Sequence, residues 1–212
     1  MKSQDNSQEG NMKEKRLNSE EAVDLMRLLI QSKIPLTKWG IRASKNFRSL
    51  LEEIQRGEAV LTLKAGNKLY RRIRVLLIDI FYQFPDSTRL LHLVERKQVL
   101  EDGRERIRKG TCSISEKLLV TEVATHTAIY RALTEELDIV GEVEFHQTDY
   151  YITQAHSKSY PGIETTSENF RFKVFLNFEQ FNPAGYITRE ENLTTFFVWQ
   201  EYQITDEQIT IK

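Results

Sequence analysis

Residues 122–137 read EVATHTAIYRALTEEL and form the one long helical pattern in the second half of the chain. On a helical wheel of 100° per residue the apolar side chains share one arc: Val123, Ile129, Tyr130, Leu133 and Leu137. The neighbouring arc carries three alanines and then two carboxylates: Ala124, Ala128, Ala132, Glu135 and Glu136. Because small side chains let another backbone come close, we expect the alanine arc to be covered. The two glutamates then lie at the rim of a packed surface, where carboxylates are costly unless a cation is near.

Strand patterns flank this helix on both sides. Before it come Val60–Leu63, Ile73–Tyr82 and Leu90–Leu100, and the second of these is an apolar run typical of a strand buried on both faces. The third strand is followed by a turn in which Gly103 takes a position that favours positive φ. After the helix come three further segments with strand character: 143–152, 170–178 and 194–202. Strands on both sides of one helix predict an α/β (α+β) domain over residues 58–205.

The first quarter of the chain has a different pattern. Residues 1–17 are polar, which predicts a disordered tail, and residues 206–212 form a C-terminal tail. Residues 18–57 are expected to form a helical N-terminal extension. Its first helix runs over Glu20–Gln31, with Asn18 and Glu21 as a capping box, and its second over Ser44–Gln55, ending at Gly57.

The overall charge and the apolar content exclude several classes of protein. The net charge of −1 results from 30 basic and 31 acidic residues, so no bulk field attracts nucleic acid or an anionic membrane, and we predict neither partner. The basic run from Arg104 to Lys109 favours a solvated strand face over a phosphate contact. No secretory signal is visible, the longest apolar run is too short to span a membrane, and the single Cys112 forms no intramolecular disulfide. These features predict a cytoplasmic protein, and they indicate no oligomeric state.

The end of the central helix is unusually acidic. Glu135, Glu136 and Asp138 lie in or after its last turn, where the helix dipole is already negative. Each exposed acid there is disfavoured by about 0.3–1 kcal/mol, so the group is expected to have a compensating cation. Mg²⁺ is one candidate, and Arg131 together with bulk water is the simpler alternative.

The order of residues in this helix resembles the Nudix box of the MutT/Nudix family. The box ends in Arg-Glu-apolar-x-Glu-Glu-x-Gly-apolar, and five residues of this chain fall on that pattern: Arg131, Leu133, Glu135, Glu136 and Ile139. The segments Lys38–Trp39–Gly40 and Tyr160–Pro161–Gly162 are similar to segments of divergent Nudix-like proteins of plants and cyanobacteria. The resemblance covers roughly residues 35–202 and implies a Nudix-like α/β/α sandwich with a mixed sheet. It also implies that Ser115–Glu116–Lys117 lies in the loop entering the helix.

The same resemblance implies a chemistry. A Nudix hydrolase uses Mg²⁺ or Mn²⁺ to cleave a diphosphate linked to another moiety by attack of water on phosphorus. By this resemblance the catalytic residues are Arg131, Glu135 and Glu136, and the metal ligands are Glu122, Glu135 and Glu136.

The departures from the box leave the activity open. Ala132 stands where the first box glutamate belongs, and Glu122 lies one residue before its strict position, which Val123 occupies. A glutamate from a later loop, Glu164 or Glu168, would have to replace the base, whose loss costs about 10²–10⁴ in rate. Three hypotheses follow: a weak Nudix-type hydrolase, an inactive Nudix-fold binding or regulatory module, and an unrelated α+β interaction domain. If the site is otherwise intact, Ala132→Glu is expected to raise activity.

Overall fold

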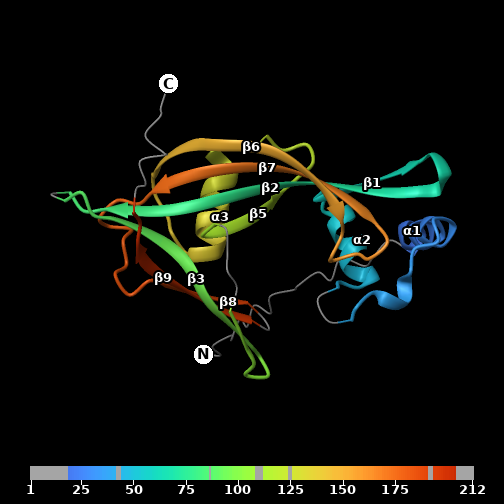
Figure 1. The fold of residues 1–212 in the computed structure, drawn as a ribbon, viewed down its shortest axis with the longest axis horizontal. Helices are drawn as coiled ribbons and strands as arrows, with labels where there is room; N and C mark the ends of the chain where they lie inside the picture. Colours follow the sequence, from blue (N-terminus) through green and yellow to red (C-terminus); the bar gives the residue numbers. More distant parts are fainter. Residues whose placement is uncertain are drawn as a thin grey trace, which may run out of the picture.

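The computed structural model describes residues 19–41, 44–85, 87–107, 112–123, 126–190 and 193–203 (Figure 1). The predicted tails lie outside these ranges. Within them the α-helices are α1 (Ser19–Gln31), α2 (Phe47–Gln55) and α3 (His126–Leu137). The strands are β1 (Ala59–Lys64), β2 (Lys68–Gln83), β3 (Leu90–Leu100), β4 (Glu105–Arg106), β5 (Ile114–Leu118), β6 (Glu144–His156), β7 (Glu164–Phe175), β8 (Tyr186–Glu190) and β9 (Leu193–Glu201). The expected α+β class with a mixed sheet and an N-terminal helical extension is confirmed.

One mixed sheet contains all of these strands, in the order β6-β7-β2-β3-β9-β8, with β1 and β5 also pairing β2 and β4 pairing β3. The long strand β2 runs parallel to β7 and antiparallel to β1, β5 and β3. It pairs with β3 only at residues 81–83. Earlier in the strand, at residues 74–78, β5 lies beside β2 instead. The sheet therefore splits, and β3, β9 and β8 diverge from β2 and β5 as a separate ribbon (Figure 1).

Helix α3 provides one side of the larger hydrophobic core. Within α3 the predicted apolar arc and the alanine arc are covered: Ile129, Leu133 and Leu137 are buried, and Ala128 and Ala132 are each 0% exposed. Ala124 lies outside the described residues. These side chains pack with apolar residues of β2, β5 and β7, such as Ile78 and Val174. The alanine arc is therefore an interior surface of the molecule.

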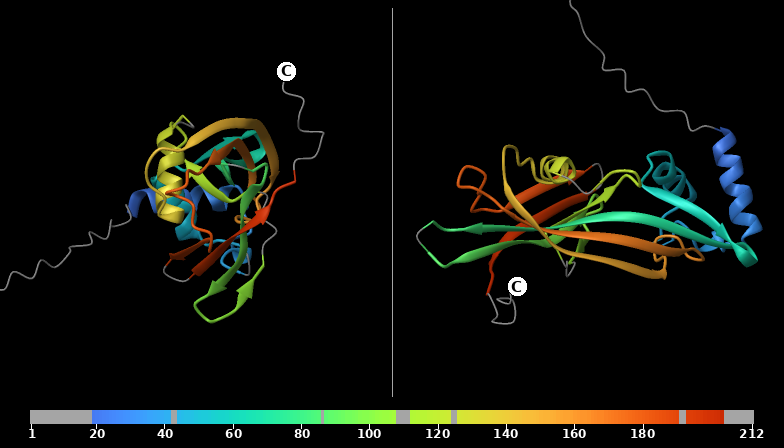
Figure 2. Two further views of the ribbon diagram at one scale, coloured as in Figure 1. Left: turned by 90° about the vertical axis from the view of Figure 1, so that its left-hand side faces the viewer. Right: turned by 90° about the horizontal axis from the view of Figure 1, so that it is seen from above.

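A second core joins the N-terminal helices to the far end of the sheet (Figures 1 and 2). The two segments that carried part of the resemblance meet here, because Trp39 Nε1 donates to the Pro161 carbonyl at 2.9 Å and its ring lies 5.2 Å from that of Tyr160. Gly162 has φ +96°, and a Cβ on it would lie 2.4 Å from Pro35 Cδ, so only glycine suits this contact. These segments therefore hold the extension against the sheet.

Several predicted boundaries change. The long helix was expected from Glu122, but α3 begins at His126, so Glu122 precedes it and Val123 is 68% exposed. Ser115–Glu116–Lys117 is not a loop but part of β5. The second helix starts at Phe47 instead of Ser44, because the Asn46 side chain accepts the Ser49 amide at 2.9 Å and caps it. The remaining predicted strands are confirmed, and β8 was not predicted.

Among the described residues, no helix combines the length and the apolar character needed to cross a membrane.

Candidate functional site

Arg131 projects from α3 toward the segment that precedes the helix. Its Nη1 and Nη2 donate to the two carboxylate oxygens of Glu122 at 2.8 and 3.2 Å, and the Leu119 amide also donates to Glu122, at 3.2 Å. The hydrogen bonds from Arg131 lower the pKa of Glu122. Glu122 is thus brought to the predicted arginine, but as its ion-pair partner. A metal ion would have to compete with the guanidinium for this carboxylate.

Glu116 is a site residue that sequence reasoning missed. It lies on β5 beneath α3, with Oε1 3.7 Å from Arg131 Nη2. Burial raises the pKa of Glu116, and the charges of Glu135 and Glu136 raise it further, against the opposing charge of Arg131. The available signal was period-two alternation, because Ile114 and Leu118 are buried on the same strand face as Glu116. Assignment of the segment to a loop concealed that face.

The paired glutamates of α3 point into different surroundings. Glu135 is exposed and lies in a shallow hollow with Tyr130, Arg131 and Thr134. Glu136 is half-buried and lines a cavity on the other side of the helix. Burial raises the pKa of Glu136, and the neighbouring charges of Glu190 and Glu135 add to the effect. The two predicted metal ligands therefore line different hollows, although the charges of both reach Glu116.

The cavity beside Glu136 lies where the sheet splits, between α3, β5 and the ribbon of β3, β9 and β8. Its volume is about 440 Å³. Three carboxylates and one guanidinium line it: Glu95, Glu136, Glu190 and Arg106. Arg106 Nη2 donates to Gln98 Oε1 at 2.7 Å, and hydroxyl groups of Ser113, Ser115 and Thr195 complete a polar wall. Among the described residues that line the cavity, carboxylates therefore outnumber guanidinium groups.

The fit of Mg²⁺ to this site depends on few donors. Within the described ranges no group of three or more His, Cys, Asp or Glu side chains could hold a metal ion. Ala132 supplies no donor and Glu122 is engaged by Arg131. Glu95, Glu136 and Glu190 are the carboxylates that line the cavity, and Mg²⁺ often uses only one or two carboxylates together with water and substrate phosphates. These residues fit a hydrated Mg²⁺ shared with a ligand, and they do not fit a cage of several carboxylates.

The two alternative bases lie on β7 and not in a loop. Glu168 pairs with Arg72 at 2.8 Å and with Arg74 at 3.4 Å, and Glu164 accepts a hydrogen bond from Gln154. Neither residue lines the cavity of Glu136. The structure therefore does not bring them to the predicted site.

No protein-family model matches the chain, and no curated protein matches it in sequence. Similar solved structures include the Ap4A hydrolase of C. elegans, with a TM-score of 0.33, 12% identity and coverage of 60% of this chain and 79% of that one. The MERS1 protein of T. brucei in complex with RNA has a TM-score of 0.31 and 15% identity, covering 68% of this chain and 45% of that one. Its apo form has a TM-score of 0.27 and 13% identity, covering 71% and 58%. Similarity at this level defines no function for the chain.

Proposed function

We propose that this protein is a small-molecule binding module of the Nudix type that has lost efficient hydrolysis. The observation that carries the proposal is the environment of Ala132. It stands at the position of the first box glutamate, is 0% exposed and packs in the core beneath α3. A carboxylate at this position would have to be accommodated inside a hydrophobic core, so the helix is built without it. The ligand occupies the cavity beside Glu136.

The charge of the cavity determines what kind of ligand it accepts. Glu136 and Glu190 face a diphosphate with the same sign of charge, and Arg106 is the one guanidinium among the described residues that line the cavity. A diphosphate-linked compound therefore binds only together with a divalent cation, which Glu136 and Glu190 help to hold. Mg²⁺ supplies the positive charge that the phosphate oxygens require.

Calorimetry with a panel of nucleoside-diphosphate-linked compounds tests this proposal. We expect binding in Mg²⁺ or Mn²⁺ and none in EDTA, with loss of binding in Glu136→Gln. Glu135→Gln is the matched control, because Glu135 is the neighbouring residue of the same helix and lies outside the cavity. Binding that is equally strong in EDTA, or equally weakened by both variants, would contradict the proposed site.

A weak hydrolase is the second candidate, and the raised pKa of Glu136 favours it. A half-buried carboxylate whose pKa is raised by burial and by Glu190 is better suited to accept a proton from water than an ordinary surface glutamate. The same samples, assayed for released phosphate or nucleotide, separate the two candidates. Turnover lost in Glu136→Gln and retained in Glu135→Gln supports the hydrolase, whereas turnover retained in both indicates contamination.

A further inference from the structure

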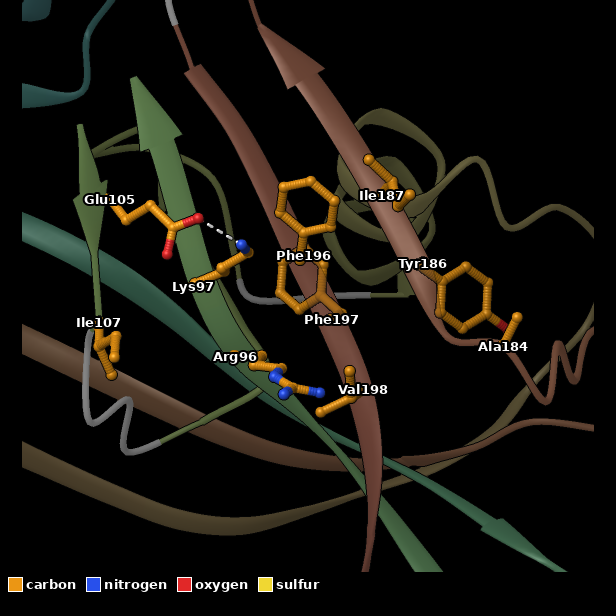
Figure 3. Close-up of a pocket in the computed structure, with 10 residues that line it drawn as sticks. All are labelled: Arg96, Lys97, Glu105, Ile107, Ala184, Tyr186, Ile187, Phe196, Phe197 and Val198. Atoms are coloured by element: carbon orange, nitrogen blue, oxygen red, sulfur yellow. Dashed lines mark hydrogen bonds and ion pairs between the residues drawn. The ribbon is translucent and has the colours of Figure 1, made fainter. Parts of the chain in front are cut away.

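The outer face of the ribbon formed by β3, β9 and β8 is an open groove (Figure 3). Its volume is about 400 Å³, and it lies on the opposite side of the ribbon from α3. The opposite face is occupied, because the Thr188 hydroxyl donates to the Glu136 carbonyl of α3. Residues that alternate with Thr188, Thr195 and Gln98 therefore point into the groove. This surface is separate from the cavity of the proposed function and goes beyond that function.

The floor of the groove is aromatic and aliphatic. One cross-strand row runs across the three strands: Phe196 on β9 pairs with Lys97 on β3 and with Ile187 on β8. Two aliphatic side chains at its margins are unusually exposed, Ile187 at 54% and Ile107 at 78%. The half-buried ring of Phe196 lies between them, as Figure 3 shows. An exposed apolar surface centred on one ring provides a stacking platform for a planar group.

The rim of the groove is basic. The exposed Arg96 is the extra residue of a β-bulge between Glu95 and Lys97 and makes no ion pair with any residue of the described ranges. Lys97 Nζ lies 5.4 Å from the centroid of the Phe196 ring and 2.5 Å from Glu105 Oε1. Arg189 continues the same face, because it is two residues beyond Ile187 on β8. Among the described residues of this face, three cations against one carboxylate give a local positive charge, within a chain whose net charge is −1.

We propose that this groove binds single-stranded nucleic acid, with a base stacked on Phe196 and phosphates contacting Arg96 and Lys97. A cationic surface with an aromatic platform is the combination that unpaired nucleotides recognise, since each base has a π-face and each linkage a negative charge. A free nucleotide offers its phosphates at one end only, whereas the cations of this surface are spread from Arg96 and Lys97 to Arg189. A polymer instead adds further phosphate contacts along the row toward Arg189.

Fluorescence anisotropy of labelled ten-nucleotide RNA and DNA, titrated with the full chain, tests the proposal. Phe196→Ala is expected to weaken binding by about 5- to 100-fold, and Phe196→Tyr to retain it, because the second variant keeps the ring. Arg96→Glu should also weaken binding, whereas Arg27→Glu, on the exposed surface of α1, is the matched control and should not. With two or three phosphates contacted, log K should fall with log salt with a slope of about −1.4 to −2.

The Glu105→Gln variant distinguishes best between phosphate binding and a structural role of the groove. Its carboxylate competes with a phosphate for Lys97, so its removal is expected to tighten binding, an effect that a merely structural role of the groove would not produce. Unchanged affinity in both Phe196→Ala and Glu105→Gln would overturn the proposal. So would equal affinity for mononucleotide and oligonucleotide, which indicates a small-ligand site. A dimer in sedimentation that Phe196→Ala dissociates would also overturn it, since the groove is then an interface between two copies.

Discussion

Two groups of carboxylates in this molecule have opposite electrostatic surroundings. The first is the joint between the N-terminal extension and the sheet, centred on the buried Glu53 of α2. Its carboxylate lies 2.5 Å from Arg71, 2.6 Å from Lys117 and 2.8 Å from Lys45. Burial by itself would raise the pKa of Glu53, but hydrogen bonds from both lysines and the charge of Arg71 outweigh it and lower the pKa to about 2.

The second group surrounds the C-terminal half of α3. Glu116 and Glu136 are half-buried like many structural acids, yet both have a raised pKa. Burial and neighbouring carboxylates raise the pKa of each, and at Glu116 they outweigh the opposing charge of Arg131. The negative end of the helix dipole adds to this cost. The fold thus surrounds Glu53 with cations and leaves the acids of α3 without enough of them.

The contrast separates a structural role from a functional one. A buried acid whose partners are all supplied by the chain stabilises the fold and needs nothing else. Half-buried acids that remain under-compensated are retained at a cost in stability, and such groups concentrate at sites that bind or transform a ligand. On this argument the joint is structural, and the cavity beside Glu136 remains the proposed place for a cation.

The largest expected effect is on the joint. Glu53→Ala leaves Arg71, which is 4% exposed, as an uncompensated buried charge, and should lower the free energy of unfolding by about 3–5 kcal/mol. The matched control is Glu52→Ala on the same helix, which removes only the ion pair with the exposed Arg48 and should cost about 0.3–0.5 kcal/mol. Urea denaturation at pH 7 measures both. Equal losses in the two variants would mean that the buried cluster contributes no more than a surface ion pair.

The next largest effect concerns Ala132, the position at which this helix departs from the Nudix box. Ala132→Glu was expected from sequence to raise activity if the site were intact, but the buried position leads to a different expectation. A carboxylate there enters the core and should cost about 2–4 kcal/mol, with no gain in hydrolysis. Thr127→Glu, at an exposed position in the first turn of the same helix, is the control and should be neutral or slightly stabilising. A folded Ala132→Glu protein with new activity would show that the metal site needs only this carboxylate.

The sequence predicted the fold better than it predicted the site, for a physical reason. Alternation and helical periodicity report which side chains are buried, so the strands and both covered arcs of α3 followed directly from the pattern. The split of the sheet depends on β2 exchanging β3 for β5 as its partner, and no local pattern encodes that exchange. The cavity lies at this split, so the sequence did not indicate Glu190 and favoured a solvated strand face for the basic run that contains Arg106.

The paired glutamates illustrate the same limit. Adjacent residues on a helix differ by about 100° in direction, so Glu135 and Glu136 share a cleft only if the neighbouring elements enclose both. Here β8 lies against one side of α3, and of the two glutamates only Glu136 lines the cavity. Likewise, the resemblance implied Glu122 as a metal ligand, and the structure shows that its carboxylate pairs with Arg131. Charge pairing is a tertiary property, and one sequence does not reveal it.

The smallest expected effect is the change in stability that Glu136→Gln causes at pH 7 and not near pH 4. The folded-state pKa of Glu136 is raised above its ordinary value of 4.5, so the ionised form is disfavoured in the folded protein. Its cost is present at pH 7 and disappears as the pH falls through the raised pKa to below 4.5, where the protonated side chain resembles glutamine. Glu136→Gln should therefore be more stable than the parent at pH 7, by a few tenths to about 1 kcal/mol given solvent screening, and equal to it near pH 4. The contribution of Glu53 to stability changes with pH in the opposite direction, because the pKa of Glu53 is lowered. That contribution is complete above pH 4.5 and is lost as the pH falls toward 2. Urea denaturation of Glu136→Gln at the two pH values measures the difference, and added Mg²⁺ should reduce the advantage of the variant at pH 7. A loss of stability at pH 7 would instead place Glu136 with Glu53, among acids whose partners the chain itself supplies.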